Sequence, residues 1–101
     1  MHYVICYDIE SDRLRDRAVK ILEKNGCHRI QKSVFMAPHL KKKDLLRLQL
    51  GLQQAFERRP LKPGDSIYIV PLSQELASET EYYGLNNAFT MLLEKKLKII
   101  L

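Results

Sequence analysis

The chain has 101 residues, enough for one domain with a substantial core and too few for two independent cores. Hydrophobic residues make up 46% and charged residues 29%, with only 4 Gly and 4 Pro and no repeats, which excludes a disordered, collagen-like or fibrous protein. Lys and Arg number 17 against 12 Asp and Glu, and the resulting net charge of +5 favours a polyanionic partner.

The first predicted element is a strand over residues 3–9, rich in β-branched and aromatic residues and with too little alternation for a half-exposed strand. It is therefore predicted to be central and buried on both faces, with Asp8 at its C-terminal end. Its apolar run is far shorter than the roughly 20 residues of a membrane span, and no basic export signal precedes it, so we expect a cytoplasmic protein with no membrane partner. Cys6 and Cys27 have neither disulfide nor metal-site spacing and are interpreted as reduced thiols.

An amphipathic helix follows over residues 12–25, because its apolar residues recur at i, i+4, i+7 and i+8. Ser11 is available as the N-cap and Gly26 as the residue after the C-cap. Alternating apolar positions then predict strand structure over residues 27–37, divided into two short strands near Lys32.

A second helix is predicted over residues 41–58, and the segment rich in Pro and Gly that follows ends it. Residues 66–72 form the next strand, where Pro71 indicates either an edge of the sheet or the point at which the chain leaves it. This order predicts an α+β, ferredoxin-like βαββαβ core over residues 1–72, with an antiparallel sheet and two helices on one face. Residues 73–101 form a C-terminal extension, with helical spacing near residue 90 and a candidate last strand at residues 97–101. Either this extension or a second copy must cover the open face of the sheet.

Charge is unevenly distributed along the chain. Residues 28–43 contain five Lys or Arg and no acid, whereas residues 74–83 contain three Glu and no base. The first segment is consistent with nucleic-acid binding and the second with a protein contact; the alternative is that both are solvated surface.

Three segments together resemble the small CRISPR-associated subunit of the adaptation pair, the Cas2 family. They are Tyr-Asp-Ile at residues 7–9, Arg-Ile-Gln-Lys-Ser-Val-Phe-Met at residues 29–36, and Ile-Val-Pro-Leu at residues 69–72. The resemblance implies a ferredoxin-like homodimer that serves as the DNA-binding scaffold of spacer acquisition together with the spacer integrase. It also implies Mg²⁺-dependent endonuclease activity, with Mg²⁺ or Mn²⁺ held at the two-fold axis by paired Asp8 residues.

Asp8 is thus the candidate catalytic and metal-binding residue. From chemistry alone, a carboxylate at the end of an apolar strand must cap a helix, pair with a cation or bind a metal. Arg13 and Arg15 are the available ion-pair partners, and these alternatives stay open at this stage.

Other candidate residues are basic or match the family segments. Arg15 and Arg17 match basic positions of the family's first helix and could hold phosphate oxygens. Ser33 and Phe35 are candidate site-lining residues, although Ser33 has no base to activate it and a lone strand Phe is more often core. None of the three histidines has metal-ligand spacing. The predicted nucleic-acid-binding residues are Arg15, Arg17, Arg29, Lys32, Lys41, Lys42 and Lys43.

Other functions compete with this interpretation. A toxin-like metal-dependent endoribonuclease would act on single-stranded RNA in place of duplex DNA. An RNA-recognition module is disfavoured because the chain lacks an aromatic RNP1-like segment. A small-molecule-sensing domain is disfavoured by the positive charge and the scarcity of Gly-rich loops.

Overall fold

The strands and helices of the core follow one another along the chain in the predicted order. The computed structural model describes residues 1–93. Its elements are β1 (His2–Asp8), α1 (Asp12–Lys24), β2 (His28–Gln31), β3 (Val34–Ala37), α2 (Lys42–Arg58), β4 (Ser66–Leu72) and α3 (Gln74–Ser78). Residues 88–93 are also helical, as their spacing predicts.

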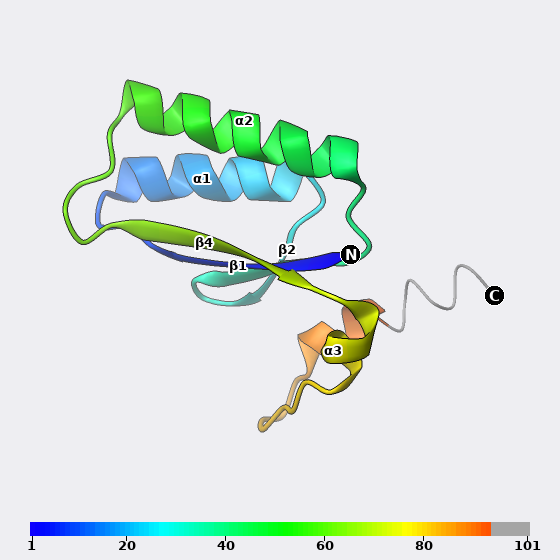
Figure 1. Ribbon diagram of the computed structural model, residues 1–101. Helices are drawn as coiled ribbons and strands as arrows, with labels where there is room; N and C mark the ends of the chain where they lie inside the picture. The colour runs from blue at the N-terminus through cyan, green and yellow to red at the C-terminus, as the bar shows by residue number, and fades with distance from the viewer. Residues whose placement is uncertain (94–101) are drawn as a thin grey trace.

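One sheet with strand order β2-β3-β1-β4 holds the domain together, and every neighbouring pair in it is antiparallel. This is the ferredoxin-like arrangement that the sequence predicts. β1 is a central strand, and β4, which contains Pro71, lies at an edge. In Figure 1, α1 and α2 lie side by side over one face of the sheet.

Both ends of α1 are fixed by the residues that the sequence assigns to them. The Ser11 hydroxyl accepts a hydrogen bond from the Leu14 N–H at 3.3 Å, and Gly26 takes a positive φ of 87°. A left-handed residue after a helix lets the chain turn back, and glycine adopts that conformation without a Cβ penalty. α1 therefore ends where β2 must begin.

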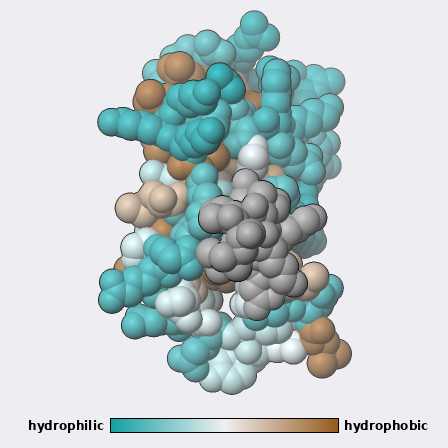
Figure 2. Space-filling model, turned by 90° about the vertical axis from the view of Figure 1, so that its right-hand side faces the viewer, coloured by the Kyte–Doolittle hydropathy of each residue, from teal (hydrophilic) through white to brown (hydrophobic). Residues whose placement is uncertain are grey.

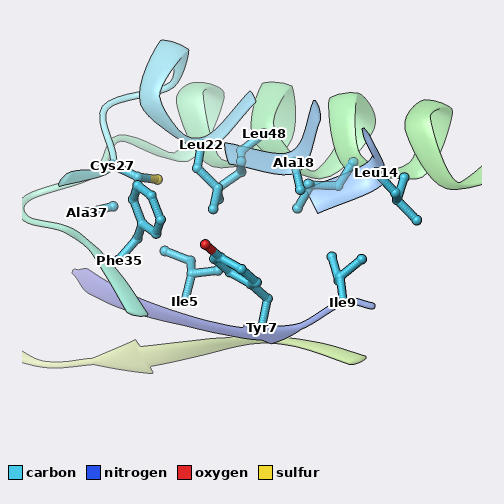
Figure 3. Close-up of a cluster of buried hydrophobic side chains, with 11 residues drawn as sticks. Ile5, Tyr7, Ile9, Leu14, Ala18, Leu22, Cys27, Phe35, Ala37 and Leu48 are labelled. Carbon is cyan, nitrogen blue, oxygen red and sulfur yellow. The ribbon is translucent and has the colours of Figure 1, made fainter. Parts of the chain in front are cut away.

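The main core lies between the helices and the sheet (Figure 3). Ile5 and Tyr7 point from β1 toward the helices, and Leu22 and Leu48 meet them from α1 and α2. Burying one such large apolar side chain contributes roughly 1.5–3 kcal/mol, so this layer supplies most of the stability of the domain. Gly51 allows the helices to approach closely, because a Cβ there would lie 3.0 Å from Ile21 Cγ2.

The opposite face of the sheet is covered only in part, so the prediction that β1 is buried on both faces is wrong for its C-terminal half. A second cluster lies under α3 and residues 88–93, where Met36, Ala77 and Leu93 are buried. Beyond this cluster, Tyr68 is 66% exposed and Val70 44% exposed on the same face of β4. The described part of the extension, residues 73–93, therefore leaves an apolar part of the open face uncovered.

A buried histidine fastens the extension to the sheet. His2 is 1% exposed, and its Nε2 lies 2.6 Å from Gln74 Oε1. Its Nδ1 accepts a hydrogen bond from the His39 N–H at 2.9 Å, so the Nε2 atom carries the proton donated to Gln74. This pair of bonds joins β1, the loop before α2 and the start of α3.

Within residues 1–93, no helix is long and apolar enough to cross a membrane. The predicted strand at residues 97–101 lies outside the described residues.

Candidate nucleic-acid interface

Asp8 stands at the C-terminal end of β1, opposite Ser66 of β4. Side chains alternate along a strand, so Asp8 lies on the face opposite Tyr7, which points into the core. Its side chain is exposed, and within the described residues its carboxylate makes no hydrogen bond or ion pair. The structural alternatives of helix capping and pairing with Arg13 or Arg15 are therefore not realised: Ser11 caps α1, and Arg15 pairs with Asp12.

A pocket of about 560 Å³ adjoins Asp8, between α1 and the turn that joins β2 to β3. Its lining brings together four of the predicted site residues, Asp8, Arg15, Arg29 and Lys32, and also Ser33. The remaining lining residues are Tyr7, Ile9, Asp16, Val19, Lys20 and Glu23. Four cations and three carboxylates thus share one concave surface beside α1, at the Asp8 end of the sheet.

The β2–β3 turn is held rigidly against β1. The Tyr7 hydroxyl donates to the Lys32 carbonyl oxygen at 3.1 Å, and the Tyr7 N–H donates to the Ser33 carbonyl oxygen at 3.1 Å. The Arg29 guanidinium also donates to the Lys32 carbonyl oxygen. Two of these bonds engage only the backbone carbonyl of Lys32, which is an exposed residue of the pocket lining.

Phe35 does not line the pocket, which corrects the prediction for this residue. It is fully buried in the core, and the Arg29 guanidinium carbon lies 4.8 Å from the centre of its ring. A cation over an aromatic face is attracted electrostatically by the ring. Phe35 therefore supports Arg29 from beneath, and Ser33 alone of the predicted lining pair reaches the pocket.

Arg15 and Arg17 lie on different sides of α1. Residues two apart do not share a helix face, and only Arg15 lines the Asp8 pocket. Arg15 also donates to the Ile9 carbonyl oxygen at 3.1 Å, so it fastens the β1–α1 connection as well as presenting charge. Arg17 instead lines a groove between α1 and α2.

The three consecutive lysines lie at the opposite end of the domain from Asp8. α2 begins near the chain's N-terminus, whereas β1 runs away from that point toward Asp8 (Figure 1). Figure 2 looks onto this end, where the side chains over the helices are mostly hydrophilic. Lys41 lines a separate pocket together with Lys24 and Arg47. The acid-free segment 28–43 is thus not one surface, and a nucleic-acid contact for Lys41, Lys42 and Lys43 stays a prediction.

A second carboxylate that the sequence analysis missed, Asp65, lies next to Ser66 at the Asp8 end. It accepts hydrogen bonds from the Glu10 N–H at 3.0 Å and the Lys62 N–H at 2.9 Å. These bonds to the charged form lower the pKa of Asp65 below its ordinary value. The sequence signal was available, since Asp within a Pro- and Gly-rich turn often binds backbone N–H groups. Asp65 is a structural residue, in contrast to Asp8.

One copy of the chain offers Asp8 as a single free carboxylate at this position. Within residues 1–93, no group of three or more His, Cys, Asp or Glu is arranged to hold a metal ion. Mg²⁺ uses one or two protein carboxylates together with waters and phosphate oxygens. The exposed and unengaged Asp8 carboxylate fits one such ligand position, and a symmetric second copy would contribute another.

Comparison with known proteins gives one consistent family. The model of the family described as CRISPR associated protein Cas2 matches residues 1–80. A relative from Synechocystis sp., named CRISPR-associated endoribonuclease Cas2 2, is 34% identical over 86 residues, covering 81% of this chain and 83% of that protein. A relative from Archaeoglobus fulgidus, named CRISPR-associated endoribonuclease Cas2 1, is 34% identical over 79 residues, covering 77% and 78%. A third, of the same name from Methanospirillum hungatei, is 46% identical over a shorter stretch of 35 residues, 35% of this chain and 37% of that protein.

Solved structures share the fold of this chain. A hypothetical protein, TT1823, from Thermus thermophilus superposes with a TM-score of 0.61 at 30% identity, covering 83% of this chain and 90% of that one. A chain from a structure titled Partial Cas6-RT-Cas1--Cas2 complex superposes with a TM-score of 0.68 at 24% identity, covering 86% and 88%, and shows the same fold.

Proposed function

Because this chain belongs to the CRISPR-associated Cas2 family, we propose that it is a homodimeric scaffold that binds duplex DNA during spacer acquisition. The observation that carries the proposal is the half-open sheet face with Asp8 at its edge, beside a pocket that presents Arg15, Arg29 and Lys32. The half-open face would be covered by a second copy of the chain. The cations of the pocket would bind phosphate groups.

Dimerisation through the open face is supported by the residues that α3 leaves uncovered. Tyr68 and Val70 expose apolar surface in a row along β4, and Asp8 stands at the end of the neighbouring strand. Across a two-fold axis, residue i of one copy contacts residue j of the other and j contacts i, so only residues near the axis meet their own copies. An axis that passes close to the C-terminal end of β1 would bring the two Asp8 carboxylates toward each other.

DNA binding is supported by the cations of the Asp8 pocket and by the way in which the fold positions them. Guanidinium groups bind phosphate oxygens through paired N–H donors, and Arg29 is held in a fixed position by Phe35 and the turn. Contacts of this kind carry no base information, so binding should be independent of sequence and fall steeply with salt. A dimer would present two such pockets to one duplex.

A partner integrase fits the same scheme. One structural neighbour comes from an assembly whose title includes Cas1 together with Cas2. The acidic segment at residues 74–83 is mostly exposed and follows the core directly, so we assign it to the contact with the integrase.

A second candidate function, metal-dependent phosphodiester hydrolysis, is favoured by the names of the relatives, which are endoribonucleases. Paired Asp8 residues would hold Mg²⁺, which would supply activated water for attack on phosphorus. RNA would then compete with duplex DNA as the natural ligand.

The substitution Asp8→Asn separates the two functions, with Asp16→Asn in the same pocket as the charge-matched control. For the scaffold, spacer integration by the reconstituted complex should persist in Asp8→Asn at close to the wild-type rate. If Asp8 also serves hydrolysis, cleavage of RNA or DNA should fall by several orders of magnitude in Asp8→Asn and little in Asp16→Asn. Loss of integration in a variant that remains folded, dimeric and DNA-bound would contradict the scaffold function and assign catalysis to this subunit.

A further inference from the structure

A second basic surface lies outside the Asp8 pocket, in the groove between the start of α1 and the end of α2. The groove has a volume of about 380 Å³. Six charged residues line it, namely Arg13, Asp16, Arg17, Lys20, Arg58 and Arg59. Five of them are cations, so this groove concentrates more positive charge than the Asp8 pocket.

The fold assembles this cluster from two distant parts of the sequence. α1 and α2 are antiparallel neighbours, so the start of one lies beside the end of the other (Figure 1). Arg13, Arg17 and Lys20 follow i, i+4 and i+7 and form one stripe, about 10 Å long at 1.5 Å per residue. Arg58 and Arg59 supply the opposite wall.

Within residues 1–93, the cations of the groove take part in no ion pair. Among residues 1–93, the ion pairs are Arg15 with Asp12 and Arg47 with Asp44, and neither includes a cation of the groove. Like charges at i, i+3 and i+4 destabilise a helix, and a second row across the groove adds repulsion. An anion bound between the two walls would relieve this repulsion.

The groove and the Asp8 pocket are adjacent. Both are lined by Asp16 and Lys20 of α1. A nucleic-acid backbone carries regularly spaced phosphate charges and so matches cations that extend from the Asp8 pocket to the groove. Arginine suits this ligand because its guanidinium group binds a phosphate through two parallel hydrogen bonds. A short acidic peptide would match one patch but not the whole path.

We infer that Arg58 and Arg59, with Arg17 and Lys20, form a second phosphate-binding track, so that a nucleic-acid backbone continues from the Asp8 pocket across α1 onto the outer, helical layer. This inference rests on the proposed DNA-binding function and extends it to a surface on the helices, away from the open face.

The test is the salt dependence of binding to a fluorescently labelled duplex, measured by anisotropy on the full-length dimer. Arg58→Gln/Arg59→Gln should weaken binding and reduce the slope of log K against log[salt] by about 0.9 for each lost contact, or roughly 1.8 for both. The control, Lys24→Gln/Arg47→Gln, removes the same charge from the pocket at the opposite end of α1 and α2 and should change the slope less. Circular dichroism checks that both variants fold.

The outcomes separate the inference from the function on which it rests. An unchanged slope in Arg58→Gln/Arg59→Gln, with a reduced slope in Arg29→Gln/Lys32→Gln, overturns the track and leaves the Asp8-pocket function standing. Equal losses in Arg58→Gln/Arg59→Gln and in the control Lys24→Gln/Arg47→Gln would mean diffuse attraction and also overturn the track. A wild-type protein that fails to bind duplex, or that releases the duplex to polyglutamate at equal charge concentration, overturns both.

Discussion

The two faces of the sheet differ in how completely other elements cover them. This difference is the basis for the proposed dimer. On one face, α1 and α2 bury Ile5, Tyr7 and Phe35 almost completely. On the other, the C-terminal extension buries Met36 but leaves Val70 and Tyr68 in contact with water. The helices cover the first face completely, whereas the described residues leave part of the second face exposed to solvent.

The two carboxylates at the end of the sheet show the same contrast. Asp65 accepts two backbone hydrogen bonds, while Asp8 accepts none from the described residues. A charge placed without partners at the edge of an apolar surface is costly when that surface becomes buried, unless a cation compensates it. The proposed dimer and its divalent cation would account for Asp8 and the uncovered face together.

The largest expected effect comes from a charge placed on the uncovered face. Val70→Glu should raise the dimer dissociation constant by roughly a hundredfold or more, because like charges brought together at an interface cost several kcal/mol. Sedimentation velocity across a dilution series measures the change.

The matched control for that experiment is Leu50→Glu, which alters an equally exposed apolar residue on α2. Leu50 is 57% exposed and Val70 44% exposed, but Leu50 lies on the helical layer. If both variants dissociate the dimer equally, the interface is not the open face.

The two cysteines report on the two faces separately. Burial raises the pKa of Cys27 to about 11, so its thiol stays protonated and should react slowly with iodoacetamide at pH 8 in every variant. Cys6 lies on the half-open face and should react at least about tenfold faster in monomeric Val70→Glu than in the wild-type dimer. Equal Cys6 rates in the two proteins would place the interface elsewhere.

Cys27 also predicts how stability depends on pH. Its folded-state pKa is raised, so its contribution is complete below the ordinary thiol pKa of about 8.5 and is lost as pH rises toward 11. Wild type should lose stability to urea over this range relative to Cys27→Ala. A constant difference between the two proteins would show that the thiol is not buried.

The smallest effect concerns Asp65. Its pKa is lowered, so its contribution to stability is present above the ordinary pKa of about 3.9 and is lost as pH falls through the lowered value. Asp65→Asn should be less stable than wild type at pH 7, with the difference vanishing in acid, whereas Asp8→Asn should show no such loss. Thermal melts of the three proteins across pH measure both effects.

Most of the fold could be predicted from the sequence because local signals agree with the tertiary arrangement. Ser11 and Gly26 mark the ends of α1, and Pro71 correctly indicates an edge strand. The error was in the burial of β1. Its apolar run showed a central strand, but no pattern within the strand records how far a distant extension covers its second face.

Less of the candidate site could be predicted, because its charges are assembled by the fold. The consecutive lysines at residues 41–43 predict a basic surface at one end of α2. Arg58 and Arg59, at the other end, lie beside the basic residues at the start of α1. Two adjacent arginines at a helix end look like ordinary cations facing the helix dipole. Only the antiparallel packing of α1 and α2 shows that they face a second basic row.

The most direct test of the central claim, that a second copy completes the open face, is the mass of the wild-type protein in solution. Each chain has a mass of 11.8 kDa. Light scattering at micromolar concentration should give twice that mass, and the same measurement on Val70→Glu should give the mass of one chain. A wild-type protein that remains at 11.8 kDa throughout the concentration range would contradict the account.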